Sequence, residues 1–224
     1  MAVETEKPQG TAGLRADARR NRDLIVAAAQ NLFLEQGVDV PLEEVARRAG
    51  VGIGTLYRRF PDRDALLGAV CEEGLRRMAE LAETAWREEP DAWHALCRFL
   101  RDSIELRVGV LSAKIEPHLH QRLRAGRELH EIRQRVIALV VRMTEQAQAS
   151  GALRHDIGPG DVALLLTLHV YTPPSMPDEP AMARVVEIML NGLRAVPGSS
   201  LPGVALDRDD LRRYTAVEHP PAAG

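Results

Sequence analysis

Three helical patterns follow one another closely between residues 21 and 63, and they constrain the fold of this chain more than any other feature. In the first, apolar residues recur at helical spacing from Ile25 onward, and Gly37 is placed to end the helix. The second begins near Pro41, has acidic residues in its first turn and ends at Gly50. The third follows within a few residues. Two short helices joined by a glycine-containing turn predict a helix-turn-helix.

The stretch EEVARRAGVGIGTLYRRF, residues 43–60, shows how these two helices can pack. Ala46 is small enough for a close approach, Gly50 permits the sharp turn, and Val51 can fill the space between the helices. The residues expected to hold the third segment against the core are Ile53, Leu56 and Phe60. The remaining outward positions are Gly52, Gly54, Thr55, Tyr57, Arg58 and Arg59.

A recognition helix lies in the major groove of DNA with its N-terminal part near the base edges, while hydroxyls and arginines reach phosphates. The six outward positions are therefore predicted to contact DNA. Basic residues before the first helix and after the third extend this prediction. They include Arg20, within the cluster at residues 15–22, and Arg63.

The rest of the chain also carries helical patterns and no alternating strand pattern of useful length. Asp62 and Asp91 are good N-caps for a long fourth helix and for the helix that follows it. Further helices are expected over residues 128–149, 161–171 and 180–195. Aromatic residues make up only 4% of the chain, which disfavours an all-β fold. The predicted class is all-α, with an N-terminal three-helix helix-turn-helix domain and a larger C-terminal helical domain.

Composition divides the chain into four parts. Residues 1–20 are expected to form a flexible basic arm, residues 21–63 the helix-turn-helix domain, and residues 64–196 the larger helical domain. Residues 197–224 are rich in proline, glycine and alanine and are predicted to be a loose tail, with room for a turn of helix at 208–214.

The cysteines, the targeting signals and the net charge limit the classes of protein to which this chain can belong. Cys71 and Cys97 lie far apart, which excludes a cysteine-based zinc site and fits a reducing cytosol. The sequence has no secretory signal and no run approaching the roughly 20 apolar residues of a membrane span. We therefore expect a cytoplasmic protein with no membrane partner. The net charge is −3, and residues 1–65 hold ten Lys and Arg against ten Asp and Glu, so DNA binding would depend on charge placement.

From Asn21 to Val70 the chain resembles the DNA-binding domain of TetR-type transcriptional repressors. The resemblance rests on the order and spacing of DLIVAAAQNLFLEQG, EEVARRAGVGIGTLYRRF and PDRDALLGAV. Pro41 and Gly52 depart from the family pattern, which often has Ser or Thr there, and Arg63 replaces a frequent lysine. The resemblance implies a homodimer that binds a double-stranded DNA operator. It also implies that the C-terminal part serves dimerisation and the binding of an unknown small molecule.

Two apolar helices in the C-terminal part are the predicted dimer interface. A helix that is apolar on nearly all sides must be covered on all sides, and a two-fold dimer reads two DNA half-sites about one helical turn apart. The alternative is that both helices are core of the monomer. The predicted interface residues are Val162, Leu165, Leu166, Val186, Met189, Leu190 and Leu193.

A ligand pocket is predicted in the same part of the chain, because binding pockets are mostly apolar with a few polar groups. The candidate lining residues are Trp93, Leu96, Phe99, Leu100, Ile104, Leu111, Leu139, Met143, His169 and Tyr171. Any one of them could instead be ordinary core. The candidates carry few fixed charges, so the expected ligand is small and largely apolar.

The sequence contains no nucleophile elbow, P-loop, dinucleotide fingerprint or HExxH motif, so no catalytic residues and no cofactor are expected. His118 and His120 are two positions apart and do not share a helix face, so we expect them to be solvated rather than to bind a metal. One alternative is an all-α small-molecule-binding protein or enzyme whose N-terminal helices are only structural. Another is a DNA-binding protein that responds to no ligand.

Overall fold

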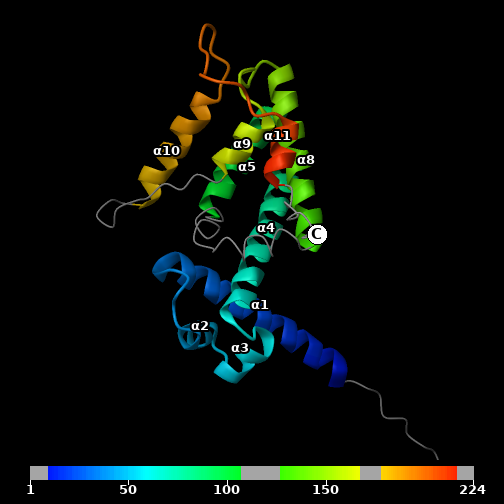
Figure 1. Ribbon diagram of the computed structural model, residues 1–224, viewed down its shortest axis with the longest axis vertical. Coiled ribbons are helices and arrows are strands. Elements are labelled where there is room, and N and C mark those ends of the chain that lie inside the picture. The colour runs from blue at the N-terminus through cyan, green and yellow to red at the C-terminus, as the bar shows by residue number, and fades with distance from the viewer. Residues whose placement is uncertain (1–9, 107–126, 167–177, 216–224) are drawn as a thin grey trace, which may run out of the picture. The chain divides into compact units, whose positions relative to one another are not determined.

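The structure of the protein, a computed structural model, describes residues 10–106, 127–166 and 178–215 (Figure 1). Within these ranges the regular elements are α-helices, together with one isolated antiparallel bridge between Leu153 and Arg194. The predicted all-α class is confirmed. The helices are α1 (Gly10–Gln36), α2 (Leu42–Ala49), α3 (Ile53–Arg59), α4 (Arg63–Glu88), α5 (Ala92–Glu105), α8 (Arg127–Ala149), α9 (Pro159–Leu165), α10 (Asp178–Gly192) and α11 (Arg208–Thr215).

The chain folds into two compact units, Met1–Val70 and Cys71–Gly224, and the division falls inside α4. The sequence predicts a domain boundary after residue 63, which lies in the first turn of α4. The structure places the division later in the same helix, after Val70. Leu66, Leu67 and Val70 are buried on the N-terminal part of α4 and belong to the first unit. In the described ranges, none of the helices combines the length and apolar character needed to cross a membrane.

The first helix begins earlier than the sequence predicts. A flexible arm is predicted over residues 1–20, whereas α1 starts at Gly10, so residues 10–20 are helical. Residues 11–21 contain no proline and consist mostly of alanine, arginine and leucine, which allow the helix to propagate backward from its amphipathic part. The helix ends where predicted. Gly37 has φ +98°, a conformation that glycine adopts without strain.

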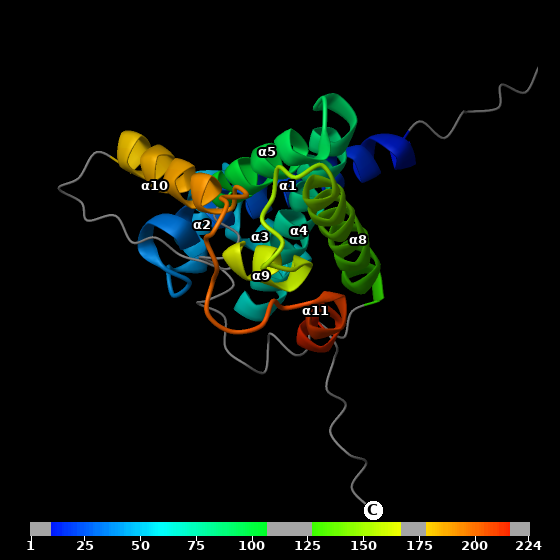
Figure 2. The same ribbon diagram turned by 90° about the horizontal axis from the view of Figure 1, so that it is seen from above.

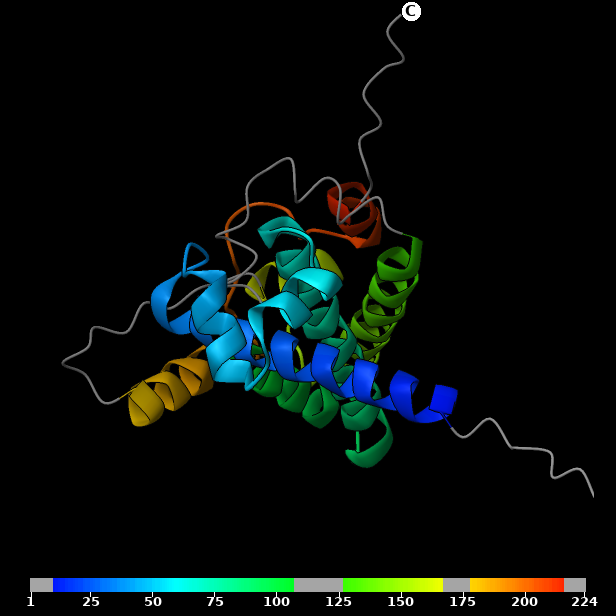
Figure 3. The same ribbon diagram turned by 90° about the horizontal axis from the view of Figure 1, so that it is seen from below.

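The helix-turn-helix forms from α2 to α3, as predicted, and α2 packs against both α1 and α3 (Figure 3). Gly50 adopts the left-handed conformation with φ +69°, and its N–H donates to the carbonyls at the end of α2. The Val51 N–H donates to the Ala46 carbonyl at 3.0 Å and closes the turn. Neither Pro41 nor Gly52 supplies a side-chain cap. The fully buried side chains of this unit include Ile25, Leu32, Phe33, Val45, Leu56 and Leu66.

In the second unit, α5, α8, α9 and α10 contribute to one apolar core together with the later turns of α4. Helix α5 packs against α8 and α10, and α8 packs against α9 (Figure 2). Asp91 caps α5 as predicted, because its carboxylate accepts a hydrogen bond from the His94 N–H at 2.9 Å. The largest fully buried side chains here are Leu96, Phe99, Leu100, Met143 and Leu153.

Several residues predicted to form a dimer interface lie in this core instead. The buried ones are Val162, Val186, Leu190 and Leu193. Those partly buried against the core are Leu165, Leu166 and Met189. The protomer itself covers these four side chains, so a dimer contact through these helices would have to use their other side chains. Among the described residues of α9 and α10, the exposed large apolar side chains are Leu164, Val185 and Ile188.

The segment after α10 is bound to the second unit, where the sequence predicts a loose tail over 197–224. We call residues 196–215 the C-terminal strap. Leu201 donates its N–H to the Asp156 carboxylate at 2.6 Å, and Asp156 is also bound by the Arg154 guanidinium. These hydrogen bonds lower the pKa of Asp156 to about 2, so the carboxylate is ionised at neutral pH. Helix α11 packs against α9 and buries Leu211.

Two glycines at the start of α9 make room for the strap. The Gly160 N–H donates to the Leu206 carbonyl at 2.9 Å. The Asp161 carboxylate accepts from the N–H groups of Gly158 and Leu206, at 2.8 and 3.0 Å. A Cβ atom on Gly160 would lie 2.6 Å from the Leu206 Cβ and 2.9 Å from its carbonyl oxygen. Only bare backbone at Gly160 therefore permits this docking.

Replacing Gly160 with alanine is expected to lower the free energy of unfolding of the second unit by about 1–3 kcal/mol, because the added methyl group overpacks the contact with Leu206. Urea unfolding monitored by circular dichroism would measure the loss. Gly192→Ala is the matched control, since a Cβ atom there meets nothing within 4 Å. Equal stability of the two variants would contradict the docking of the strap at this position.

Candidate nucleic-acid interface

Helix α3 presents most of its surface to solvent. Leu56 is its buried side chain, and Phe60 is buried just beyond its end. Thr55 is half-buried, and the other predicted contact residues of this segment are exposed: Gly52, Gly54, Tyr57, Arg58 and Arg59. Tyr57 is 46% exposed although it is aromatic. The structure thus leaves these side chains available on the surface of α3.

Ile53 is an exposed apolar residue that the sequence analysis placed in the core. Its side chain is 39% exposed at the first residue of α3. Apolar side chains at this end of a recognition helix can contact the methyl group of thymine in the major groove. The helical spacing of Ile53 with Leu56 and Phe60 suggested burial, and no signal in the sequence separated it from them. We add Ile53 to the surface that we call the recognition surface, residues 52–59 without Leu56.

The charges of the first unit are balanced within α2 and unbalanced on α3. Arg47 of α2 donates from Nε to Glu44 at 2.8 Å, and this hydrogen bond lowers the pKa of the Glu44 carboxyl. Arg48 of α2 pairs with Glu35 of α1 at 3.0 Å. By contrast, Arg58 donates to the Thr55 hydroxyl at 3.1 Å. Among the described residues, neither Arg58 nor Arg59 has a carboxylate within ion-pair distance, so their positive charge is available to a polyanion.

Arg63, a predicted DNA contact, forms hydrogen bonds within the first unit. From the first turn of α4 its guanidinium donates to the carbonyl of Val38 and, at 2.7 Å, to the carbonyl of Val40. These carbonyls belong to the connection between α1 and α2. The side chain is partly buried and braces this connection from inside the domain. We therefore leave Arg63 out of the recognition surface. Arg20 is exposed on α1, so it extends from a rigid helix instead of from a flexible arm.

The predicted pocket residues that the structure describes share the apolar core of the second unit. Leu96, Phe99, Leu100 and Met143 are fully buried, Trp93 is buried, and Ile104 and Leu139 pack against the core. Leu111, His169 and Tyr171 lie outside the described residues, as do His118 and His120. Within the described ranges, no three His, Cys, Asp or Glu side chains gather as metal ligands would.

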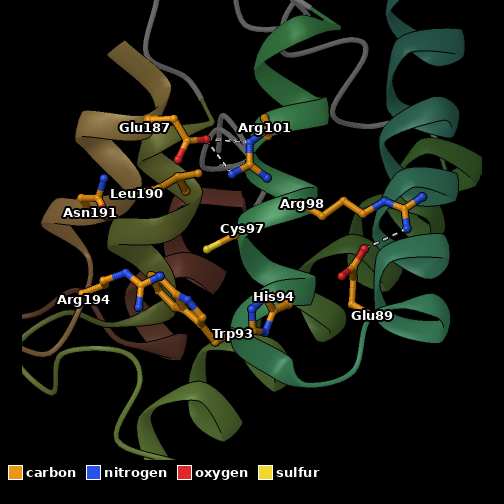
Figure 4. Close-up of a pocket in the computed structure, with 10 residues that line it drawn as sticks. All are labelled: Glu89, Trp93, His94, Cys97, Arg98, Arg101, Glu187, Leu190, Asn191 and Arg194. Carbon is orange, nitrogen blue, oxygen red and sulfur yellow. Dashed lines mark hydrogen bonds and ion pairs between the residues drawn. The ribbon is translucent and has the colours of Figure 1, made fainter. Parts of the chain in front are cut away.

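Two pockets of the second unit are lined by charged side chains that the sequence did not single out. One, of about 250 Å³, lies between α5 and α10 (Figure 4). The other, of about 550 Å³, is lined by Arg76, Glu80 and Glu83 of α4 and by Glu131 and Arg135 of α8. A charge on a helix face usually indicates a solvated surface, which is why the sequence pattern gave no signal for either pocket.

Both parts of the chain are similar to known regulatory proteins. The profile of bacterial regulatory proteins of the tetR family matches residues 25–70. The profile described as the C-terminal domain of SbtR-like transcriptional regulators matches residues 91–195. The first match contains the whole helix-turn-helix, and the second ends where the C-terminal strap begins.

Two solved structures are similar over most of the chain. A TetR transcription regulatory protein from Mycobacterium vanbaalenii is 31% identical, with 81% of this chain and 99% of that chain covered and a TM-score of 0.56. A TetR transcriptional regulator from Streptomyces coelicolor is 32% identical, with 78% and 99% covered and a TM-score of 0.56.

Similarity to curated relatives is confined to a shorter stretch. An HTH-type transcriptional regulator from Staphylococcus aureus is 31% identical over 93 residues, which is 41% of this chain and 48% of that protein. The chain thus spans about half the length of the curated relatives it matches. Together the matches describe a DNA-binding transcriptional regulator and not an enzyme. The chain belongs to the TetR family of bacterial transcriptional regulators.

Proposed function

We propose that the protein is a homodimeric transcriptional repressor of the bacterial cytoplasm that binds a palindromic operator through α3 and is released by a small, largely apolar ligand. The observation that carries the DNA-binding part is the charge on α3. Arg58 and Arg59 are exposed and unneutralised among the described residues, beside the exposed Tyr57, whereas the arginines of α2 are paired. A domain with no net basic charge therefore places its available positive charge on the helix that enters the groove.

Arg58→Ala or Tyr57→Ala is expected to weaken operator binding by about 1–3 kcal/mol, provided that each side chain makes a specific contact. The probe is a DNA duplex that the purified protein selects from a random pool, and binding is measured by fluorescence anisotropy. Both side chains are exposed, so thermal unfolding should change little. If both variants bound the duplex with undiminished affinity, the assignment of α3 to the major groove would be wrong.

Arg20→Ala tests for a contact with the phosphate backbone of DNA, which carries no sequence specificity. A side chain that reaches only phosphates should lower the affinity for the selected duplex and for a scrambled duplex by the same factor, and should reduce the salt slope by about 1. A loss confined to the selected duplex would instead assign Arg20 to base recognition.

We base the proposed dimer contact on the exposed apolar side chains of α9 and α10. Leu164, Val185 and Ile188 are the exposed large apolar side chains of these helices in the described ranges. Val185 and Ile188 are three positions apart and lie on one helix face. An isologous two-fold contact between copies of this surface would cover them. We call Val185 and Ile188 of α10 the exposed apolar face and propose that it meets its own copy in the dimer.

The proposed ligand would act through α4, which is continuous across the division between the two units. A ligand can shift the protein away from its DNA-binding state only if it binds the two states with different affinity. The coupling is reciprocal, so operator DNA must weaken ligand binding by the same factor by which the ligand weakens DNA binding. The test begins with a screen of small apolar compounds for release of the selected duplex. The affinity of an active compound is then measured with and without DNA, and the affinity for DNA is measured with and without the compound. Release without the reciprocal weakening would exclude the coupling.

A further inference from the structure

The pocket between α5 and α10 has a charge pattern that the proposed DNA binding and dimerisation do not use (Figure 4). Trp93, Cys97 and Arg101 line it from α5, and Glu187, Asn191 and Arg194 line it from α10 and the residues just after it. The residues from the α10 side are spaced four and three positions apart and form one stripe. Val185 and Ile188, of the exposed apolar face, do not line the pocket.

One positive charge in the pocket remains after the ion pairs are counted. Arg101 donates to Glu187 at 2.6 and 2.9 Å, so these two groups neutralise each other. Arg98, at the rim, pairs in the same way with Glu89 at 3.0 Å. The Arg194 guanidinium lies over the Trp93 ring, 5.1 Å from its centre, and has no acidic partner among the described residues. The pocket therefore has an uncompensated guanidinium.

Arg194 is held in place on both its backbone and its side chain. It forms the isolated antiparallel bridge with Leu153. The neighbouring hydrogen bonds run from Arg154 N–H to Leu193 carbonyl and from Ala195 N–H to Ala152 carbonyl, both at 3.1 Å. The cation–π contact with the Trp93 ring restricts the position of the guanidinium. A donor held in this way loses little conformational freedom when it binds an anion.

Two residues in the middle of the pocket, Cys97 and Leu190, are apolar. In Figure 4 the Cys97 side chain points from α5 toward α10, where Leu190 and Asn191 lie opposite it. Burial raises the pKa of the Cys97 thiol to about 11, so the sulfur is neutral at physiological pH and adds no negative charge. The Asn191 amide makes no hydrogen bond within the described part of the chain. The pocket thus has an uncompensated guanidinium at one end and the apolar side chains of Cys97 and Leu190 beside it.

We propose that this pocket binds a small organic carboxylate, with the carboxylate on Arg194 and Asn191 and a short apolar body over Cys97 and Leu190. A guanidinium offers two parallel N–H donors that match the two oxygens of a carboxylate. The neutral Arg101–Glu187 pair closes the far end of the pocket. The volume of about 250 Å³ limits the body to a few carbon atoms. Trp93 is the one residue of this site that the sequence also predicts to line a ligand pocket, and occupancy of the site does not require DNA.

Trp93 provides a direct signal for this binding. The chain has two tryptophans, so a Trp86→Phe variant leaves Trp93 as the single indole fluorophore. We expect its emission to change saturably with sodium salts of straight-chain acids from acetate to octanoate, and the matched neutral amides to have no effect. Isothermal titration calorimetry on the native chain should give the same order of affinity.

Arg194→Gln is expected to lower the affinity for the preferred acid about tenfold or more, since a charge-assisted bidentate contact is lost. Arg184→Gln is the matched control, because it removes an exposed arginine of the preceding helix, α10, that does not line the pocket. Both substitutions are at exposed positions, and equal unfolding midpoints would show that both variants fold.

Three results would overturn the proposal. The first is that no acid of the series binds in calorimetry. The second is that Arg194→Gln and Arg184→Gln bind equally well. The third is that the amides or inorganic phosphate bind as tightly as the acids, since neither combines a planar carboxylate with an apolar body.

Discussion

Replacing Ile188 with glutamate is expected to convert the protein from a dimer to a monomer and to lower operator affinity by about 10²–10⁴-fold, because the second half-site is then no longer bound intramolecularly. Ile188 is 63% exposed on α10, the most exposed member of the exposed apolar face. Two such charges would face each other across a two-fold contact and would be desolvated there without a partner. Sedimentation velocity at micromolar concentration measures the assembly state, and fluorescence anisotropy measures the affinity for DNA.

Two further variants serve as controls for the expected loss of the dimer. Val204→Glu makes the same change at a position that is 93% exposed on the C-terminal strap, and it should leave both the dimer and the affinity unchanged. Leu190→Glu places the charge in the core, where the side chain is 3% exposed, and it should unfold the second unit instead of separating the subunits. A dimeric Ile188→Glu protein with full DNA affinity would contradict the exposed apolar face as the interface.

The contrast between Ile188 and Leu190 also shows that the sequence does not predict which apolar residues of a helix are exposed. Apolar spacing on α10 correctly predicts a helix with apolar residues on more than one side. It does not say whether a given residue is covered by the same protomer or left exposed. Val186, Leu190 and Leu193 face the core while Val185 and Ile188 do not, and this rotation of the helix depends on its packing against α5, which is distant in sequence.

Local signals in the sequence were sufficient for most helix ends. Gly37 and Gly50 adopt the left-handed conformations expected at the ends of α1 and α2, and Asp62 and Asp91 accept the expected capping hydrogen bonds. These features depend on one residue and its immediate neighbours, so a single sequence contains them. The start of α1 was missed because a helix can propagate through residues with no apolar pattern of their own.

Contacts between distant segments account for the remaining differences. Gly158 and Gly160 look like loop residues in the sequence, yet they provide the space in which Leu206 docks, more than 40 positions later. The two charged pockets require residues from helices that are far apart in the chain. On α3, the predicted contact residues Tyr57, Arg58 and Arg59 are exposed because position within one short helix largely decides exposure.

Arg63 gives the second large expected effect, and it is one on stability. Replacing it with methionine should lower the free energy of unfolding of the first unit by about 3 kcal/mol, taking the lower end of the range for each of its two hydrogen bonds to carbonyls. Methionine keeps much of the apolar stem of the side chain and removes the donors to Val38 and Val40. Urea unfolding followed by circular dichroism measures the loss.

A matched pair of variants separates the bracing role of Arg63 from a direct contact of its side chain with DNA. Arg59→Met removes an exposed arginine with no acidic partner among the described residues, so it should weaken DNA binding and leave stability unchanged. Arg63→Met should lower stability first, and any loss of DNA affinity should be recovered at a temperature where the first unit remains folded. Arg63→Lys keeps a donor and should restore part of the stability. If Arg63→Met instead retained full stability and lost affinity at every temperature, its guanidinium would have to leave the Val38 and Val40 carbonyls to contact DNA, and the bracing role would be wrong.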